Sequence, residues 1–182
     1  MSRESVVAHQ RRRILDALAE AFGEVGYQQT TVERVVARAG VSRKTFYEIH
    51  GGRPDWFVVL CDRIATDLLA RVDAALAGAP AAERPHALAG ALVGFCAERP
   101  RDARICFVES LAAGDAARAW RAGLIARLSE RIAGDGPDLA ARAAVGAAVE
   151  LTAEGTVRAA PGAATDLVAC LLARGDLGEP HR

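Results

Sequence analysis

Two short amphipathic segments meet at a glycine within residues 36–52, VARAGVSRKTFYEIHGG. Apolar residues recur at helical spacing before the turn, and Gly40 stands where a helix commonly ends in the left-handed conformation. Ser42 is a natural N-cap for a second helix, whose only apolar members are Phe46 and Ile49. This helix is too short to be stable alone, so its neighbours must support it. The turn therefore predicts a helix-turn-helix unit.

Helical periodicity continues along the rest of the chain. The alanine-rich sequence contains only 5% aromatic residues, which favours helix over sheet, and no alternating strand pattern competes. Around the helix-turn-helix unit we expect helices over about 5–23 (ending at Gly23 or Gly26), 54–77, 84–99, 101–113, 115–133, 138–160 and 163–174. The predicted fold is all-α with about nine helices. An N-terminal three-helix head, residues 1–53, precedes a C-terminal antiparallel helical bundle, the body, residues 54–182.

The formal net charge of zero hides a difference between head and body. The head contains nine Lys and Arg against six Asp and Glu, whereas the body contains 14 against 17. The second helix of the unit offers several hydrogen-bond donors, two of them cationic: Ser42, Arg43, Lys44, Thr45 and Tyr47. A short cationic ridge fits the DNA major groove, which is about 12 Å wide. The head is therefore expected to bind double-stranded DNA.

Other roles for the same side chains stay open at this point. Tyr47 can pack against the first helix with its hydroxyl in water, and Arg43 and Lys44 can form a solvated face. The arginine run at 11–13 fits a solvated face of the first helix better than a groove contact. Only the whole set, together with the turn chemistry, favours DNA binding.

The stretch TTVERVVARAGVSRKTFYEIHGGRPDWF resembles the DNA-binding head of the tetracycline-repressor (TetR) family. The matching positions are Thr31, Ala39, Gly40, Val41, Ser42, Thr45, Phe46, Tyr47, Gly52 and Arg53. The resemblance implies phosphate contacts from Thr31, Tyr47 and Arg53. It implies base-facing or groove-edge roles for Ser42, Arg43, Lys44 and Thr45. The chain departs from the family pattern at Val36, at Ile49–His50 and at Pro54.

The last two expected helices are the candidate dimer surface. AARAAVGAAVEL is built of small residues that let helices approach closely, and LVACLLA offers a broad apolar face. A buried core helix within one subunit is the alternative. The resemblance implies a homodimer held by a four-helix contact from 138–160 and 163–174 of both subunits. Such a dimer would read a palindromic operator, because its two heads are related by a two-fold axis.

The resemblance also implies a pocket in the body for a small-molecule effector of largely apolar character. Candidates by position are Ile64, Leu68, Phe95, Cys106, Phe107, Glu109, Trp120 and Leu124, each of which can equally be plain core. Glu109 follows ICFV and Glu150 follows AAV, so each is a candidate buried carboxylate that needs a partner or a cationic ligand. Glu154 and Arg158 are expected to pair on a helix surface.

The function that these observations favour is a ligand-responsive transcriptional regulator, a repressor that a small molecule releases from DNA. An enzyme is not expected, because the chain lacks a nucleophile elbow, a carboxylate–histidine set and a phosphate loop. No cofactor or metal site is expected either. The four widely spaced cysteines fit reduced thiols in the cytoplasm, and no apolar run suggests a signal peptide or membrane span. A thiol-based redox sensor using Cys96 and Cys106, or a helical interaction module without a DNA role, remains possible.

Overall fold

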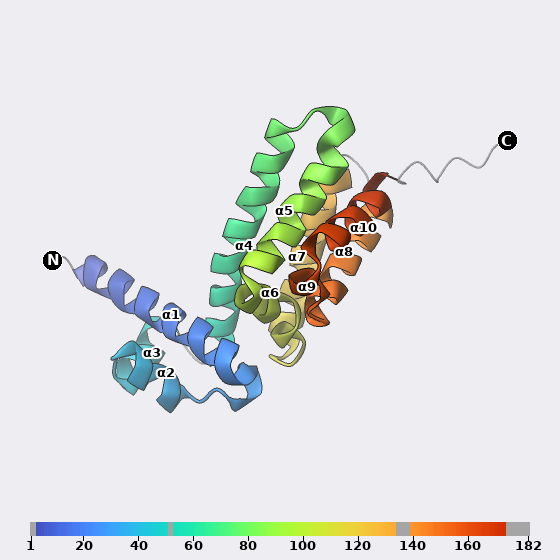
Figure 1. The fold of residues 1–182 in the computed structure, drawn as a ribbon. Coiled ribbons are helices and arrows are strands. Elements are labelled where there is room, and N and C mark those ends of the chain that lie inside the picture. The colour runs from blue at the N-terminus through green and yellow to red at the C-terminus, as the bar shows by residue number, and fades with distance from the viewer. Residues whose placement is uncertain (1–2, 51–52, 134–138, 174–182) are drawn as a thin grey trace.

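The fold is described by a computed structural model that covers residues 3–50, 53–133 and 139–173 (Figure 1). Its helices, with η marking short 3₁₀ segments, are α1 Arg3–Gln29, α2 Val32–Ala39, α3 Arg43–His50, α4 Arg53–Gly78, η1 Ala81–Glu83, α5 Arg84–Glu98, α6 Pro100–Phe107, η2 Glu109–Leu111, α7 Asp115–Ala133, α8 Leu139–Ala153, α9 Thr156–Ala159 and α10 Pro161–Ala173. Within the described ranges no strand forms. The predicted all-α class, with a three-helix head and a helical body, is confirmed.

The first helix is longer than predicted. It passes through Gly23 and reaches Gln29, with one break at Gly26, where φ is 78° and ψ is 170°. Tyr27, which follows the break, is buried, and its ring lies 5.6 Å from Phe22 and 5.1 Å from Phe57. This aromatic packing stabilises the segment that follows Gly26. The Thr30 hydroxyl also donates to the Gly26 carbonyl at 2.7 Å.

Helix α4 runs from the head into the body (Figure 1). Its Trp56 and Phe57 are fully buried against the head, where the Trp56 indole donates to the Phe46 carbonyl at 3.3 Å. Further along, Leu60, Ile64 and Leu68 continue the same buried stripe into the body. The core is therefore continuous from head to body along one helix.

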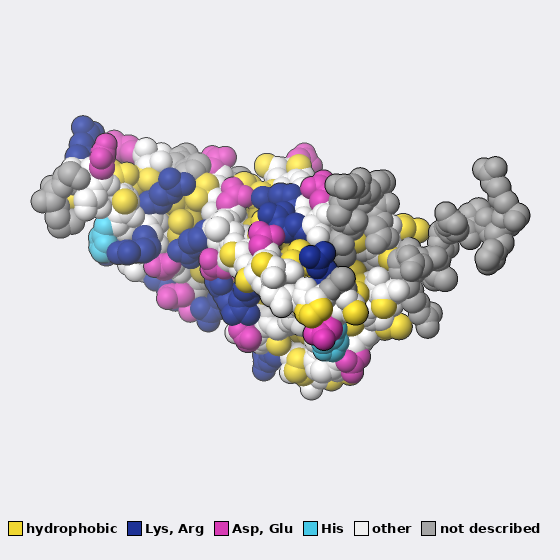
Figure 2. Space-filling view, turned by 90° about the horizontal axis from the view of Figure 1, so that it is seen from above, with side chains coloured by type: hydrophobic (Ala, Val, Ile, Leu, Met, Phe, Trp, Pro, Cys, Tyr) yellow, Lys and Arg dark blue, Asp and Glu magenta, His cyan; other side chains and the backbone are white. Residues whose placement is uncertain are grey.

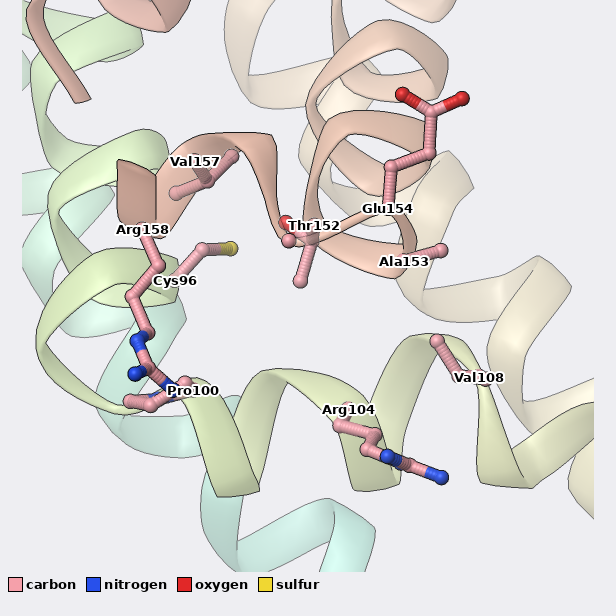
Figure 3. A pocket seen from close by; sticks show the side chains of 10 residues that line it. Cys96, Pro100, Arg104, Val108, Thr152, Ala153, Glu154, Val157 and Arg158 are labelled. Carbon is pink, nitrogen blue, oxygen red and sulfur yellow. The ribbon is translucent and has the colours of Figure 1, made fainter. Parts of the chain in front are cut away.

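The segment expected to be one helix over 138–160 is two. Helix α8 ends at Ala153, and Gly155 adopts a left-handed conformation with φ 80° before the four-residue α9 begins. The predicted Glu154–Arg158 pair is wrong, because the two residues do not share a helix and the Glu154 carboxylate points away from Arg158 (Figure 3). Similarly, the helix expected over 101–113 is α6 followed by η2.

Candidate nucleic-acid interface

Local hydrogen bonds set the ends of the two helices in the turn. The Thr31 hydroxyl accepts from the Arg34 amide at 3.3 Å and caps α2. Gly40 ends α2 in the left-handed conformation, with φ 61° and ψ 41°. Residues other than glycine adopt this conformation only with strain. The Ser42 hydroxyl accepts from the Thr45 amide at 3.0 Å and caps α3. Thr31 and Ser42 therefore form the predicted N-cap hydrogen bonds, and Gly40 has the predicted left-handed conformation.

Buried aromatic packing holds α3 against the rest of the head. Phe46 is fully buried, and its ring lies 5.4 Å from the Trp56 ring of α4. The Arg13 guanidinium of α1 donates to the Gly40 carbonyl at 3.4 Å and so braces the turn from behind. Sequence reasoning took the arginine run at 11–13 for a solvated face and missed this contact, which joins residues 27 apart.

A polar ridge on α3 faces away from the protein. Ser42, Arg43 and Lys44 are exposed at its N-terminal end. Tyr47, one turn later, is 47% exposed, and its ring stands edge-on to Phe46 with its centroid 5.4 Å away. Thr45 is half-buried, and its hydroxyl lies 2.9 Å from that of Ser42. The predicted residues of this helix thus come together on one surface.

Carboxylates accompany both cations of the ridge. Arg43 pairs with Glu33 of α2 at 2.9 Å, and Lys44 lies 3.6 Å from Glu48. The pKa of Glu33 is lowered, first by a backbone hydrogen bond and then by the nearby Arg43 charge. All four side chains are more than half exposed, so these pairs contribute little to stability. On the face shown in Figure 2, basic and acidic side chains are likewise interspersed.

Thr31 and Arg53 complete the predicted DNA-contacting set. Thr31 is exposed at the N-terminus of α2. The same helix contacts the polar ridge, because its Glu33 pairs with Arg43 of α3. Arg53 begins α4, but its side chain lies outside the described residues, as does that of His50. A residue that sequence reasoning missed is Arg38, which ties α2 to α1 by contacts to Glu24 at 2.9 Å and Glu20 at 3.6 Å.

The predicted effector residues lie in the core of the body. Ile64, Leu68, Phe95, Cys106, Phe107 and Leu124 are all buried. Trp120 is half-buried, and its indole donates to an Asp62 carboxylate oxygen at 2.6 Å. A cavity in the body has other lining residues, from α5, α6 and the α8–α9 turn (Figure 3). A role of these eight residues in effector binding stays a prediction.

Glu109 is a buried carboxylate, as predicted, and its partners belong to the chain itself. One oxygen accepts from the Tyr27 amide of α1 at 2.8 Å, and the other lies 3.1 Å from Arg104 Nε. Glu109 therefore ties η2 to the break in α1, a contact between residues 82 apart. Glu150 differs from the expectation, since its side chain is exposed on α8.

The geometry of the thiols does not favour redox chemistry. Cys61, Cys96 and Cys106 are buried, and Cys170 is exposed. Burial raises the pKa of Cys96 to about 11 and raises that of Cys106 as well. A thiol with a raised pKa is mostly protonated at neutral pH and therefore a poor nucleophile. Among the described residues, no group of three or more His, Cys, Asp and Glu is placed to hold a metal ion.

The capped turn, the supported α3 and the exposed polar ridge define a helix-turn-helix head of the DNA-binding class, carried on an all-helical body. Residues 14–49 match the family model for bacterial regulatory proteins of the tetR family. This match over the N-terminal region confirms the resemblance to the TetR family seen in the sequence. The chain matches no curated protein.

Solved structures share the fold over nearly the whole chain. The fatty acid degradation regulator FadR from Bacillus halodurans is 18% identical, with a TM-score of 0.73 over 95% of this chain and 97% of that one. FadR from Bacillus subtilis, in complex with stearoyl-CoA, is 17% identical, with a TM-score of 0.70 over 93% and 99%. A TetR-family transcriptional regulator from Streptomyces coelicolor is 24% identical, with a TM-score of 0.66 over 94% and 97%. None of the described helices here could span a bilayer.

Proposed function

We propose that this protein is a ligand-responsive transcriptional repressor that binds a palindromic operator as a homodimer. The observation that carries the proposal is the polar ridge of α3, held outward by the buried Phe46 in a region that matches the tetR family. Residues 1–53 act as the DNA-binding domain, and residues 54–182 bind the effector and the second subunit. The cytoplasm, where its DNA lies, is the expected location.

Within the head, two kinds of contact share the work. Thr31, Tyr47 and Arg53 bind phosphates and position the head, whereas the N-terminal end of α3 meets base edges. Ser42, Arg43, Lys44 and Thr45 make up this second group. On DNA, phosphate oxygens replace Glu33 and Glu48 as neighbours of the two cations, a low-cost exchange because these pairs are exposed.

The dimer surface is formed by α8 and α10. On α10, Ala163, Leu167 and Cys170 form an exposed apolar stripe at helical spacing. On α8, the exposed residues Arg142, Gly146 and Glu150 follow one another at four-residue intervals. When two copies of α8 cross antiparallel at Gly146, Arg142 lies opposite Glu150 of the partner subunit, so the charges are complementary about the two-fold axis.

A small molecule bound in the body releases the dimer from the operator. The stearoyl-CoA complex of the Bacillus subtilis regulator supports an effector-binding role for a body of this fold. A ligand shifts the equilibrium only through its different affinities for the two states, and a ratio of about 10²–10³ is enough to matter. The candidates for an apolar part of this site are the buried apolar residues predicted from sequence: Ile64, Leu68, Phe95, Cys106, Phe107 and Leu124.

Selection of bound fragments from random duplex DNA tests the proposal. We expect a two-fold symmetric consensus, and affinity that falls steeply with salt because phosphate contacts release counterions. Lys44→Ala should relax the sequence preference, since Lys44 is assigned to base edges. Arg84→Ala on α5 is the matched control, as its exposed cation lies in the body. Recovery of random fragments by the unmodified protein contradicts the proposal.

A further inference from the structure

A cavity of about 340 Å³ opens between α5, α6 and the α8–α9 turn (Figure 3). Cys96 of α5, Val108 after α6 and Val157 of α9 supply its apolar wall. Its polar lining residues are Thr152, Glu154 and the arginines Arg104 and Arg158. The volume lies near the lower end of the range for small-molecule sites, roughly 300–1,000 Å³. None of the eight effector candidates predicted from sequence lines it.

The charge around the cavity favours an anion. Arg104 of α6 and Arg158 of α9 both line the cavity. The Arg158 guanidinium lies beside Pro100, the Arg104 side chain runs along α6 away from Arg158, and the Glu154 carboxylate is turned outward (Figure 3). In the described part of the chain, Arg158 has no carboxylate within ion-pair distance, and Arg104 pairs only with Glu109 through Nε. The remaining N–H groups of both guanidiniums are available for a carboxylate, which arginine binds with two parallel hydrogen bonds.

One wall residue of this cavity is connected to the head. Arg104 contacts Glu109 at 3.1 Å, and the other oxygen of Glu109 accepts the Tyr27 amide at 2.8 Å. Tyr27 directly follows the glycine that breaks α1. Glu109 is 9% exposed, so it depends on these two partners for the interactions that water would otherwise supply. Any ligand that draws Arg104 away weakens the hold of the body on α1.

We propose that this cavity binds a small carboxylate with a short apolar chain through Arg104 and Arg158, and that the Arg104–Glu109–Tyr27 contacts transmit this binding to the head. The carboxylate replaces Glu109 as the partner of Arg104. Glu109 then keeps only the Tyr27 amide and shifts towards water, which loosens the attachment of η2 to the break in α1. The regulatory half of this proposal rests on the proposed function, because it assumes that the position of the head governs DNA binding.

Calorimetry with sodium hexanoate tests the site. We expect binding with a dissociation constant in the millimolar range, which is about −4 kcal/mol. Hexanamide has the same chain without the charge and should bind at least tenfold more weakly. Arg158→Gln should also weaken hexanoate binding about tenfold, whereas Arg84→Gln outside the cavity should leave it unchanged. Equal binding of hexanoate and hexanamide, or no heat with hexanoate, overturns the site.

Hydrogen exchange at the Tyr27 amide tests the transmission without DNA. Hexanoate should speed this exchange about tenfold in the unmodified protein. Glu109→Gln keeps an acceptor for the amide but loses the ion pair, so hexanoate should no longer change the rate. Because Arg104 is 62% exposed, Arg104→Gln should fold even if Glu109→Gln does not, and it should abolish the response too. An unchanged Tyr27 rate at saturating hexanoate overturns the transmission.

DNA titrations separate this inference from the proposed function. Loss of affinity for the selected DNA with hexanoate, absent in Arg104→Gln, supports both. Hexanoate binding and faster Tyr27 exchange in a protein that binds no DNA leave the site intact and contradict the function. Operator binding by a protein that shows no response to hexanoate in any assay overturns only the inference.

Discussion

Tyr47 combines two roles that are separable at the level of single atoms. Its ring packs edge-on against the buried Phe46, and its hydroxyl projects from a side chain that is 47% exposed. Packing and recognition therefore depend on different parts of the same residue. A substitution that removes only the oxygen isolates the recognition part.

Tyr47→Phe should weaken binding to all DNA sequences about tenfold, because one hydrogen bond to a charged oxygen contributes roughly 1.5 kcal/mol. The free energy of unfolding should not change, since the ring contact remains. Fluorescence anisotropy with the selected operator and with unrelated duplex DNA measures the effect. A loss confined to the operator would assign Tyr47 to base reading instead.

Cys96 shows what burial does to a single thiol. Its pKa of about 11 means that roughly one molecule in a thousand carries a thiolate at pH 8. Iodoacetamide should therefore label the exposed Cys170 at pH 8 and leave Cys96 unmodified, with Cys96 labelling rising about a hundredfold by pH 10. Peptide mass spectrometry measures both sites in one sample. Equal rates at pH 8 would revive the redox-sensor hypothesis.

The same pKa has a consequence for stability. In the unfolded chain the thiol loses its proton near its ordinary pKa, about 8.5, whereas the folded protein holds it until about pH 11. The contribution of Cys96 to the free energy of unfolding is therefore fully present below pH 8.5. It is lost as the pH rises from about 8.5 to about 11. Alkaline conditions should thus favour unfolding.

At the scale of elements, sequence reasoning succeeded where the determining residues are neighbours. Thr31, Gly40 and Ser42 each act within a few positions of themselves, so their caps and the turn were predictable. The helix over 138–160 was overextended because alanine-rich periodicity hides the effect of Gly155. The Glu109–Tyr27 bond had no local signal, since it joins positions 82 apart. Burial of Glu109 was predictable from its apolar neighbours, but its partners were not.

Gly26 is the element-scale feature most sensitive to change. Its φ of 78° and ψ of 170° are accessible almost only to glycine, and an added Cβ would lie 3.2 Å from a Glu109 oxygen. Gly26→Ala should therefore lower the free energy of unfolding by about 1–3 kcal/mol, measured by urea titration.

Gly123→Ala in α7 is the matched control. An added Cβ there meets nothing within 4 Å, so alanine should raise the free energy of unfolding by about 0.5–1 kcal/mol. Identical midpoints for the two variants would argue against a break in α1 at Gly26.

At the scale of the whole molecule, the proposed two-fold contact across α8 makes a prediction about charge. Arg142→Glu should dissociate the dimer, because it faces Glu150 of the partner subunit with a like charge. Glu150→Arg alone should do the same, and the double variant should restore the dimer. Light scattering after size-exclusion chromatography measures each state. Arg84→Glu is the control, and a double variant that stays monomeric contradicts the predicted pairing.

The buried Trp56 and Phe57 belong to α4, yet they complete the packing beneath α3 and α1. A chain cut at residue 53 would expose Phe46 and Tyr27, so the first 53 residues should not fold when expressed alone. A chimera with the head of one regulator and the body of another should therefore be joined within α4, after Trp56 and Phe57. Recombination between two such genes before this point would pack the head of one protein against the α4 aromatic residues of the other, which do not fit it. The head that chooses the operator and the body that responds to the effector should therefore be inherited together.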